Sequence, residues 1–396
     1  MSPLAPEDRW HSIDIIRGIA LLGIFIANIS LFQIPHLFIS DPPLSEGSDQ
    51  WIQLFIDLFI QNKFFSLFAI LFGLGSYIFL SRAQEKGNMY RKLYIRRMLI
   101  LFFIGLLHLI FIWYGDILHS YAVAGVVLLV FYRRKLKTII VWICLFASLL
   151  FLLVVATLFV PQEKLEAGIE GTRDANAVQV EQAVSVYHNA SYIDWIVYRF
   201  SHEVIPVLKS TPFSMLTALF MFLLGLSIGK SKLVSHFEEK KSFIKRLWLI
   251  TFILSLTISG VMFSLYFDMF DLGARSDVYI QMFMMFSAIS HSLFYFSSLL
   301  WLLQSSRWQK ILKPFQFVGR MALTNYLLQS IIGVGFFAGF GLFGSLNLRL
   351  GLAVVVVVFL IQILVSYYWL KAFHYGPMEW LWRTATYGKR QPLKKR

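Results

Sequence analysis

Long apolar runs constrain this chain more than any other feature of its sequence. One of them, "GLAVVVVVFLIQILVSYYWL" at 351–370, contains no charged residue. An α-helix rises about 1.5 Å per residue, so about 20 apolar residues cross the ~30 Å hydrocarbon core of a bilayer. Apolar residues make up 58% of the 396 residues, more than a soluble protein of this length can bury. The sequence therefore predicts a polytopic membrane protein.

Apolar segments of this kind recur about ten times along the chain. In lipid, every backbone polar group has to be satisfied within the protein, so each segment is predicted to be an α-helix. The predicted fold is an all-α helical membrane bundle, a single transmembrane domain over 1–396. The predicted spans are 12–32, 60–80, 97–114, 117–132, 138–160, 213–230, 247–267, 278–303, 318–343 and 350–371.

Basic residues between the spans predict the orientation of the bundle in the cell membrane. Cytoplasmic loops of membrane proteins are rich in Lys and Arg, and external loops are not. The stretch 33–50 contains neither residue, which places it outside. The strongly basic segments, which alternate with such loops, are 81–97, 132–137, 230–246, 305–320 and 388–396. Both termini are therefore predicted to be cytoplasmic, and the net charge of +14 suits anionic lipid, so no nucleic-acid partner is expected.

Two segments outside the spans have a distinct composition. Residues 161–212 predict an external loop with an amphipathic helix, because apolar residues recur at helical spacing within 192–204. This loop could cover the outer face, but a plain surface connector is favoured. Residues 373–396 predict an aromatic and basic cytoplasmic tail, with an interfacial helix that begins near Pro377.

The stretch "HLIFIWYGDILHSYAVAG" at 108–125 carries two histidines, an aspartate and two tyrosines in apolar surroundings. Ionisable groups at bilayer depth are costly and are usually functional. A single helix over 98–132 would be ~52 Å long, well beyond the ~30 Å core. The chain is therefore predicted to turn at "WYGD", 113–116, with two short spans on either side.

The predicted turn allows His108 and Asp116 to meet, although they would lie ~12 Å apart on one straight helix. His108 is a candidate general base that Asp116 would orient, and a structural imidazole is the alternative. Because the two spans are short, their outer ends are expected to line a wet funnel. The residues predicted to line it are Asp116, His119, Ser120 and Tyr121.

Charged residues lie at the ends of the first two spans. Asp14 and Arg17 are three positions apart on one helix, so they can pair at the cytoplasmic entrance. An interfacial ion pair and an anion clamp for phosphate both remain open for them. Lys63, near the outer start of the second span, is expected to extend to the interface, with substrate contact as the alternative.

Uncharged polar residues occur deeper in the spans. Asn325 and Gln329 share one face of the ninth span, where hydrogen bonds between helices are favoured and substrate contact is the alternative. His291 has no acidic neighbour in sequence and is interpreted as a hydrogen-bonded core histidine. No zinc-ligand spacing, phosphate loop or G-x-S-x-G motif is present, so no metal is expected.

Five motifs occur in a fixed order along nearly the whole chain. They are "DIIRGIALLGIFIANI", "NKFFSLFAILFGLG", "RRMLILFFIGLLHLIFIWYGDILHSYAVAG", "GRMALTNYLLQS" and "HYGPMEWLWRTATYG". This set resembles the YeiB-like family of bacterial membrane proteins. That family is similar in design to transmembrane acyltransferases, including heparan-glucosaminide N-acetyltransferase and bacterial cell-surface O-acetylating enzymes. The resemblance implies a helical bundle that moves acetyl groups from cytoplasmic acetyl-CoA to acceptors across the membrane.

The match to the acyltransferases extends to particular residues. Asp14, Arg17 and Gly18 match the D-x-x-R-G with which the O-acetylating enzymes open. Those enzymes carry a histidine further along the same span, in the region where this chain has Asn28. Either catalysis has moved to another residue, with His108 the first candidate, or acyl transfer has been lost.

The expected function is transfer of an acetyl group from acetyl-CoA to a sugar hydroxyl or an amine that enters from outside. Arg17 and Asp14 would hold the coenzyme, and His108 with Asp116 would catalyse. The expected substrate contacts are Asn28, Lys63, His119, Tyr121, Asn325 and Gln329. The alternatives are a proton-coupled transporter that uses the same intramembrane His and Asp, and a purely structural protein. The expected partners are the bilayer, the acyl donor and a glycan or small acceptor, and a homodimer stays open.

Overall fold

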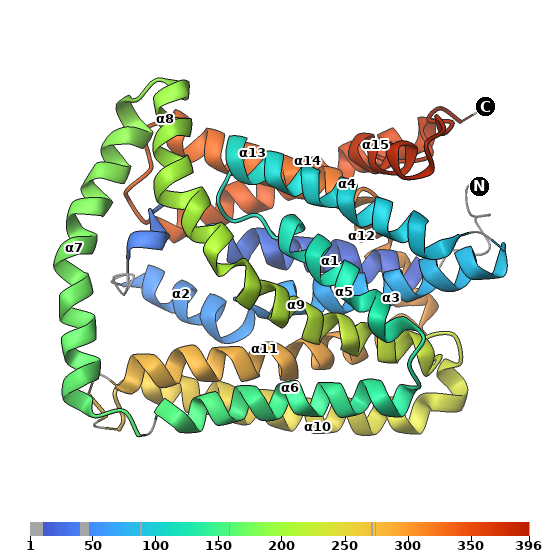
Figure 1. The fold of residues 1–396 in the computed structure, drawn as a ribbon, viewed down its shortest axis with the longest axis horizontal. Helices are drawn as coiled ribbons and strands as arrows, with labels where there is room; N and C mark the ends of the chain where they lie inside the picture. The colour runs from blue at the N-terminus through green and yellow to red at the C-terminus, as the bar shows by residue number, and fades with distance from the viewer. Residues whose placement is uncertain are drawn as a thin grey trace.

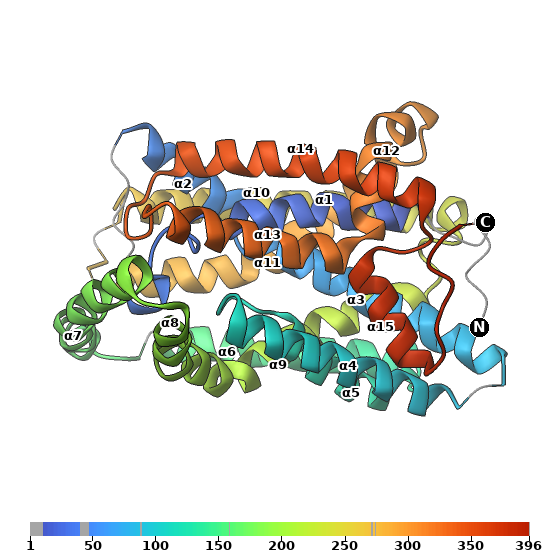
Figure 2. The same cartoon turned by 90° about the horizontal axis from the view of Figure 1, so that it is seen from above.

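The computed structural model describes residues 11–39, 47–87, 89–157, 159–270, 272–273 and 275–395 as a helical bundle (Figure 1). Its helices are α1 (His11–Ala27), α2 (Ser48–Phe59), α3 (Lys63–Glu85), α4 (Tyr90–Phe111), α5 (Leu118–Tyr132), α6 (Leu136–Thr157), α7 (Gln162–Asn189), α8 (Tyr192–Arg199), α9 (Ile205–Lys230), α10 (Phe237–Tyr266), α11 (Arg275–Leu302), α12 (Ser306–Arg320), α13 (Ala322–Gly339), α14 (Leu348–Ala372) and α15 (Pro377–Tyr387). Seen from above, α14 and α4 lie on opposite faces of the bundle, with α1 between them (Figure 2).

The predicted all-α membrane bundle is confirmed. In the described part, seven helical segments are long and apolar enough to cross a bilayer, and α5 and the first part of α6 are shorter apolar helices. Each predicted span coincides with a helix, namely α1, α3, α4, α5, α6, α9, α10, α11, α13 or α14. Apolar side chains are exposed along the outside of the bundle, as on α14 at Val356, Leu360 and Leu364. Such a surface suits contact with lipid.

Several predicted boundaries are wrong. The span predicted to reach residue 32 ends as a helix at Ala27, and turns follow it. The span predicted over 318–343 is broken at Met321, between α12 and α13. The predicted external stretch 33–50 leads directly into α2, although 40–46 lies outside the described residues. Hydropathy alone did not detect α2, because polar residues interrupt its apolar face.

The segment predicted as an external loop, 161–212, is helical over most of its length. In Figure 1, α7 runs across the end of the bundle opposite the termini. A short π-helical turn at Phe200–Val204 joins α8 to α9, so α9 begins at Ile205 rather than at the predicted residue 213. Polar residues in the first turns of α9 lower its hydropathy there. This extension of α9 matters below because it covers part of the candidate site.

Hydrogen bonds and stacking fasten α7 and α8 to the bundle. The Tyr187 ring lies face to face with Phe343 at 4.0 Å, and its hydroxyl donates to Glu203 Oε1 at 2.8 Å. Arg199 is fully buried, and its Nε pairs with Glu203 Oε2 at 2.6 Å. Its other nitrogens donate to the carbonyls of Leu109 and Ile110 at the end of α4. Helix-end carbonyls lack partners within their own helix, so Arg199 satisfies them.

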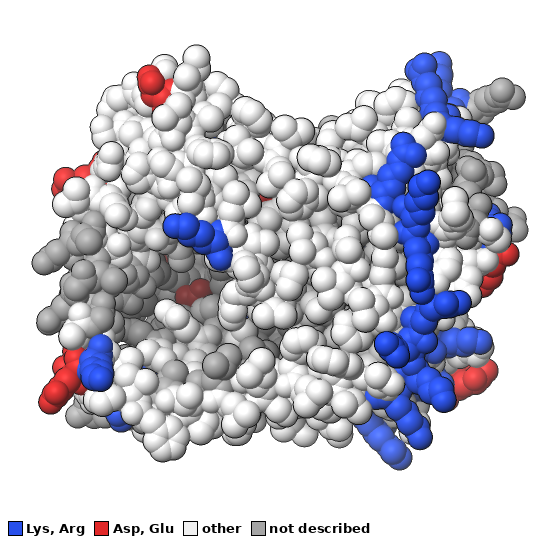
Figure 3. Space-filling view, in the orientation of Figure 1, with Lys and Arg blue, Asp and Glu red and all other residues white. Residues whose placement is uncertain are grey.

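Lys and Arg side chains gather at one end of the molecule. Figure 3 shows them along the side where both termini lie in Figure 1, while the middle of this face is almost uncharged. The positive-inside rule expects this distribution when one end faces the cytoplasm. The observed geometry therefore fits the predicted orientation with both termini cytoplasmic.

The helix predicted to begin near Pro377 is present as α15. Its Glu379 carboxylate accepts hydrogen bonds from Leu323 N at 2.7 Å, from Thr324 N at 3.1 Å and from Thr324 Oγ1 at 2.6 Å. The first N–H groups of any helix have no partner within it. Glu379 therefore caps the start of α13 from a distant part of the sequence.

Candidate functional site

The turn between α4 and α5 places the polar residues of 108–125 inside the bundle. The backbone N–H groups of Ile112 and Trp113 both donate to the His108 carbonyl at 2.9 Å, which ends α4. The Tyr326 hydroxyl of α13 donates to Gly115 O at 3.2 Å and accepts from Ile117 N at 3.4 Å. Figure 1 shows the turn set well inside the ends of α10 and α11.

His108, Asp116 and His119 form a hydrogen-bonded triad at this turn. His108 Nδ1 lies 2.9 Å from Asp116 Oδ1, and His119 Nδ1 lies 2.7 Å from Asp116 Oδ2. The backbone N–H of His119 also donates to Oδ2 at 2.9 Å, so this carboxylate caps α5 as well. The three side chains are almost completely buried. The turn thus brings together the two residues whose contact it was predicted to allow.

Gly105 makes room for the triad on α4. A Cβ at this position would lie 2.4 Å from the His119 backbone N and 2.9 Å from Asp116 Oδ2. Contacts this short do not occur, so a larger residue would push α5 away from α4. The close approach of the two helices is therefore tied to glycine at this position.

The wet funnel predicted from the short spans is not found. His119 Nε2 lies 3.2 Å from Thr211 Oγ1 and 3.1 Å from Ser120 Oγ, and Ser120 Oγ lies 2.9 Å from Ser214 Oγ. Tyr121 donates to a carbonyl of α3, and like Asp116, His119 and Ser120 it is buried. The outward extension of α9 explains the difference, because its hydroxyls cover the residues that were expected to be wet.

His108 differs from His119 in having one nitrogen without a partner. The carboxylate on Nδ1 fixes the proton there in the neutral ring, which leaves the lone pair on Nε2. Nε2 is buried and has no hydrogen-bond partner within the described residues. The ring lies between Tyr326 and Trp113, at centroid distances of 5.3 and 6.5 Å. This nitrogen is therefore open to a partner from a bound ligand.

Three more buried polar atoms without partners in the described structure come from nearby residues: Asn28 Oδ1, Trp113 Nε1 and Gln329 Oε1. Phe32, one turn after Asn28, packs on Trp113 at 4.5 Å. A Cβ at Gly333, one turn after Gln329, would lie 2.7 Å from the Phe32 ring. Buried polar atoms are rarely unsatisfied. Trp113 borders the His108 ring, so a polar ligand beside His108 would find at least one further unsatisfied atom there.

Asn325 and Gln329 mainly join α13 to its neighbours. Asn325 Nδ2 donates to Ser366 Oγ at 3.0 Å and to Val318 O at 3.2 Å. Gln329 Nε2 donates to Gln362 Oε1 at 2.9 Å, which leaves its own oxygen free. Asn325 therefore joins helices, as the favoured interpretation expected. Gln329 also joins helices, but its side-chain oxygen has no partner among the described residues.

Lys63 does not extend to the membrane interface as expected. It is fully buried, and its Nζ donates to the backbone carbonyl of Asp57. Tyr266 donates to Asp57 Oδ2 at 3.1 Å. The missed helix α2 explains this error, because it packs beside the start of α3. His291, by contrast, lies 3.2 Å from Ser259 Oγ and 2.9 Å from Ser287 O, as expected for a core histidine.

Arg17 and Asp14 lie at the end of the bundle near the termini. Arg17 Nη1 is 2.9 Å from Asp14 Oδ1 and 3.5 Å from the Gly319 carbonyl of α12. Arg17 keeps 26% of its side chain exposed. About 16 Å of helix rise separates Arg17 from the level of Asn28, so the pair does not contact the triad.

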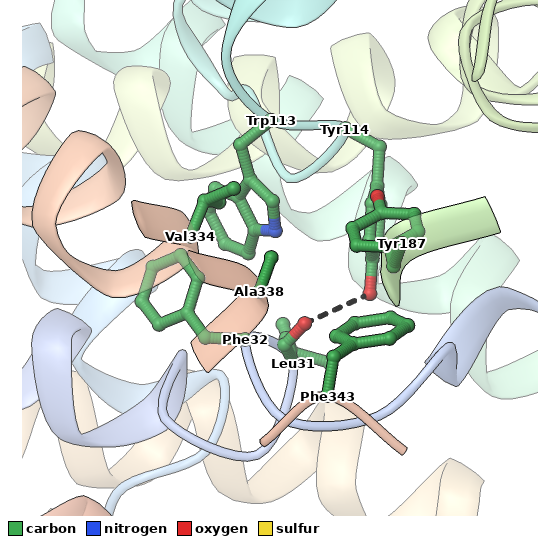
Figure 4. Close-up of a pocket in the computed structure, with 8 residues that line it drawn as sticks. All are labelled: Leu31, Phe32, Trp113, Tyr114, Tyr187, Val334, Ala338 and Phe343. Carbon is green, nitrogen blue, oxygen red and sulfur yellow. Dashed lines mark hydrogen bonds between the residues drawn. The ribbon is translucent and has the colours of Figure 1, made fainter. Parts of the chain in front are cut away.

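Trp113 and Tyr326 belong to the site but were not singled out from the sequence. Trp113 also lines a narrow cavity on the side away from the termini, together with Leu31, Phe32, Tyr114, Tyr187, Val334, Ala338 and Phe343 (Figure 4). The cavity has no room for a water molecule, and Tyr114 donates to Leu31 O across it at 3.4 Å. Since Tyr187 belongs to α7, this helix contributes one wall of the cavity.

Comparisons with known proteins find relatives over the full length of the chain. It is 32% identical to "Uncharacterized protein YxaH" of Bacillus subtilis (strain 168), over 100% of this chain and 98% of the relative. It is 28% identical to "Uncharacterized protein YeiB" of Escherichia coli (strain K12), over 96% of each chain. A family model described as "Protein of unknown function (DUF418)" matches residues 228–389. No solved structure matches the chain.

Proposed function

Because the chain belongs to the YeiB-like family, and the names of the two relatives above state no activity, we propose a function from the site itself. The protein is an acyltransferase of the cell membrane that moves an acetyl group from acetyl-CoA to a hydroxyl or amine acceptor. The observation that carries this proposal is the free, buried Nε2 of His108 beside a carboxylate-bound Nδ1. That arrangement is the one a general base requires.

The triad can carry the proton through the whole reaction. His108 Nε2 takes the proton of the acceptor O–H or N–H while the acceptor oxygen or nitrogen attacks the thioester carbonyl carbon. Asp116 stabilises the imidazolium that forms, as carboxylates do for other catalytic histidines. When the C–S bond breaks, the imidazolium returns the proton to the leaving sulfur. Acetylated acceptor and coenzyme A are then the products, and His108 is neutral again.

The other unsatisfied atoms support an acceptor rich in polar hydrogens. The oxygens of Asn28 and Gln329 lack donors, and a sugar hydroxyl or an amine would supply them. The Trp113 indole N–H lacks an acceptor, and the developing oxyanion of the thioester would supply one. These roles keep Asn28 and Gln329 as proposed substrate contacts. His119 instead holds Asp116, and Tyr121 joins α5 to α3 through the Phe65 carbonyl.

One observation favours a proton-coupled transporter instead. Lys63 is a second buried ionisable side chain, bonded to the backbone carbonyl of Asp57, and acetyl transfer would not use it. Intramembrane charges often mark ion pathways. Acyl transfer remains the better-supported function, because His108 and the adjacent Trp113 both carry unsatisfied buried nitrogens, whereas Lys63 Nζ has a partner.

The deciding experiment measures coenzyme A release from acetyl-CoA by the purified protein in lipid nanodiscs. Sugars, amines and envelope glycans serve as acceptors. Acceptor-dependent release supports acyl transfer. Absence of release with every acceptor, together with proton flux in liposomes that depends on Lys63, would replace it with the transporter.

A further inference from the structure

Two arginines meet where α4 packs on α15. Arg97 of α4 stacks on the ring of Trp382, and Arg383 is the next residue along α15. The two charges are close enough to interact. In the part of the chain that the structure describes, no ion pair to a carboxylate joins Arg97 or Arg383. Like charges held together repel, and a bound anion would offset this cost.

Arg97 is held by its flat face, which leaves its edges available. Its guanidinium carbon lies 3.6 Å from the centre of the Trp382 ring and 5.0 Å from that of Phe79. Trp382 Nε1 donates to the Arg97 carbonyl at 2.8 Å, which fixes α15 against α4. A stacked guanidinium still presents its N–H groups in the plane, in the geometry that matches phosphate oxygens.

Arg383 is arranged in the same way. Its guanidinium carbon lies 4.6 Å from the centre of the Tyr375 ring and 5.6 Å from that of Tyr387. Its Nε is buried and has no hydrogen-bond partner among the described residues. Leaving a buried charged donor without an acceptor costs free energy, so a bound anion that accepts from this nitrogen would stabilise the site.

We propose that Arg97 and Arg383 form a phosphate-binding cradle between α4 and α15. Resting on the acyl-transfer proposal, we assign it to the phosphate esters of the acyl donor. Arg97 and His108 lie on the same helix, ~16 Å apart along its axis. Coenzyme A carries its phosphates and its thioester at opposite ends, so a donor anchored here can extend toward the base. The same phosphate chemistry occurs in lipid headgroups, which the experiment separates from the donor.

The test measures coenzyme A binding by calorimetry in nanodiscs of phosphatidylcholine, without any acceptor. Arg97→Gln and Arg383→Gln are each expected to weaken binding by about 10- to 100-fold, the loss of one charged hydrogen bond. Arg134→Gln, an exposed arginine at the same end of the bundle, should leave it unchanged. Acetyl-pantetheine, which has no coenzyme phosphates, should bind these variants and the wild type alike.

Two further measurements keep the outcome clear. Thermal unfolding of each variant, with Arg97→Lys as the variant that keeps the charge, separates lost binding from lost folding. In nanodiscs with phosphatidylglycerol, a lipid site would show reduced co-purified lipid in Arg97→Gln while coenzyme A affinity stays constant. That result would retain the phosphate cradle and overturn its assignment to the donor. If folded Arg97→Gln and Arg383→Gln retain both lipid and coenzyme A as the wild type does, the cradle does not exist.

This design also separates the cradle from the reaction. A wild-type protein that binds coenzyme A through these arginines but transfers no acetyl group would support the cradle and overturn the acyltransferase. If the folded arginine variants transfer acetyl groups and bind coenzyme A as the wild type does, that result would support the acyltransferase and overturn the cradle.

Discussion

At the scale of single residues, two imidazoles share one carboxylate but have different chemistry. His119 has partners on both nitrogens, Asp116 on one and the hydroxyls of Thr211 and Ser120 on the other. His108 has only Asp116. A nitrogen that is already hydrogen bonded cannot readily take a proton from a substrate. His108 is therefore the proposed base, and His119 is proposed to keep Asp116 in place.

Replacing His108 by Ala should reduce acetyl transfer by roughly 10²–10⁴-fold, the usual contribution of a general base. Coenzyme A binding should persist, because Arg97 and Arg383 lie at the other end of α4. His291→Ala is the matched control, since it removes another buried imidazole that has partners on both nitrogens. The assay is acceptor-dependent coenzyme A release at saturating donor. Full activity in His108→Ala would mean that another residue acts as the base.

The closed surface over the triad gives a second prediction. In a Cys144→Ser background, Ser120→Cys should resist an impermeant maleimide, because Ser120 is only 4% exposed. Tyr192→Cys on α8 should react readily, since Tyr192 is 62% exposed near the same end. The readout is mass shift after labelling of intact membranes. Equal labelling at the two positions would indicate an open, wet entrance.

At the scale of helices, the site depends on how closely α4 and α5 approach. Gly105→Ala should destabilise the protein by about 1–3 kcal/mol, the usual cost of overpacking a tight contact. It should also reduce acetyl transfer, because the added methyl group would displace His119 and Asp116. Gly75→Ala is the control, since a Cβ on Gly75 in α3 meets nothing within 4 Å. Alanine there should be neutral or stabilising by up to about 1 kcal/mol.

Denaturant unfolding in detergent micelles measures both effects on the same scale. The two variants could instead unfold at the same denaturant concentration and keep full activity. In that case α4 and α5 can move apart without loss, and their close approach is not needed for function.

Sequence patterns predicted some helices well and missed others for physical reasons. The turn at 113–116 followed from length alone, since 98–132 is too long for one span. The first half of α7 has a polar sequence, and the helix packs on the bundle through its second half, where Val180, Ala183 and Tyr187 share one face. The burial of Lys63 depends on α2, and the free nitrogen of His108 depends on partners that other helices do not supply. Local patterns contain no information on these distant contacts.

At the scale of the whole molecule, charge is separated along the bundle axis. A reporter fused after Arg396 or inserted within 83–96 should score cytoplasmic, because Lys and Arg surround both positions. A reporter inserted within 165–190 should score external. Activity of paired cytoplasmic and external reporters in whole cells reads out each position. The ten-span arrangement is wrong if the reporters at 83–96 and 165–190 lie on one side.

The carboxylate of Glu379 has a consequence for the order in which the protein is made. It caps α13, whose Tyr326 holds the turn that carries Asp116. A ribosome releases α13 well before it releases α15, so the first turn of α13 emerges with its N–H groups unsatisfied. The turn that carries Asp116 is therefore expected to reach its final geometry only after α15 has been made and has docked. A chain that stops before Pro377 would insert into the membrane but leave this turn unfinished.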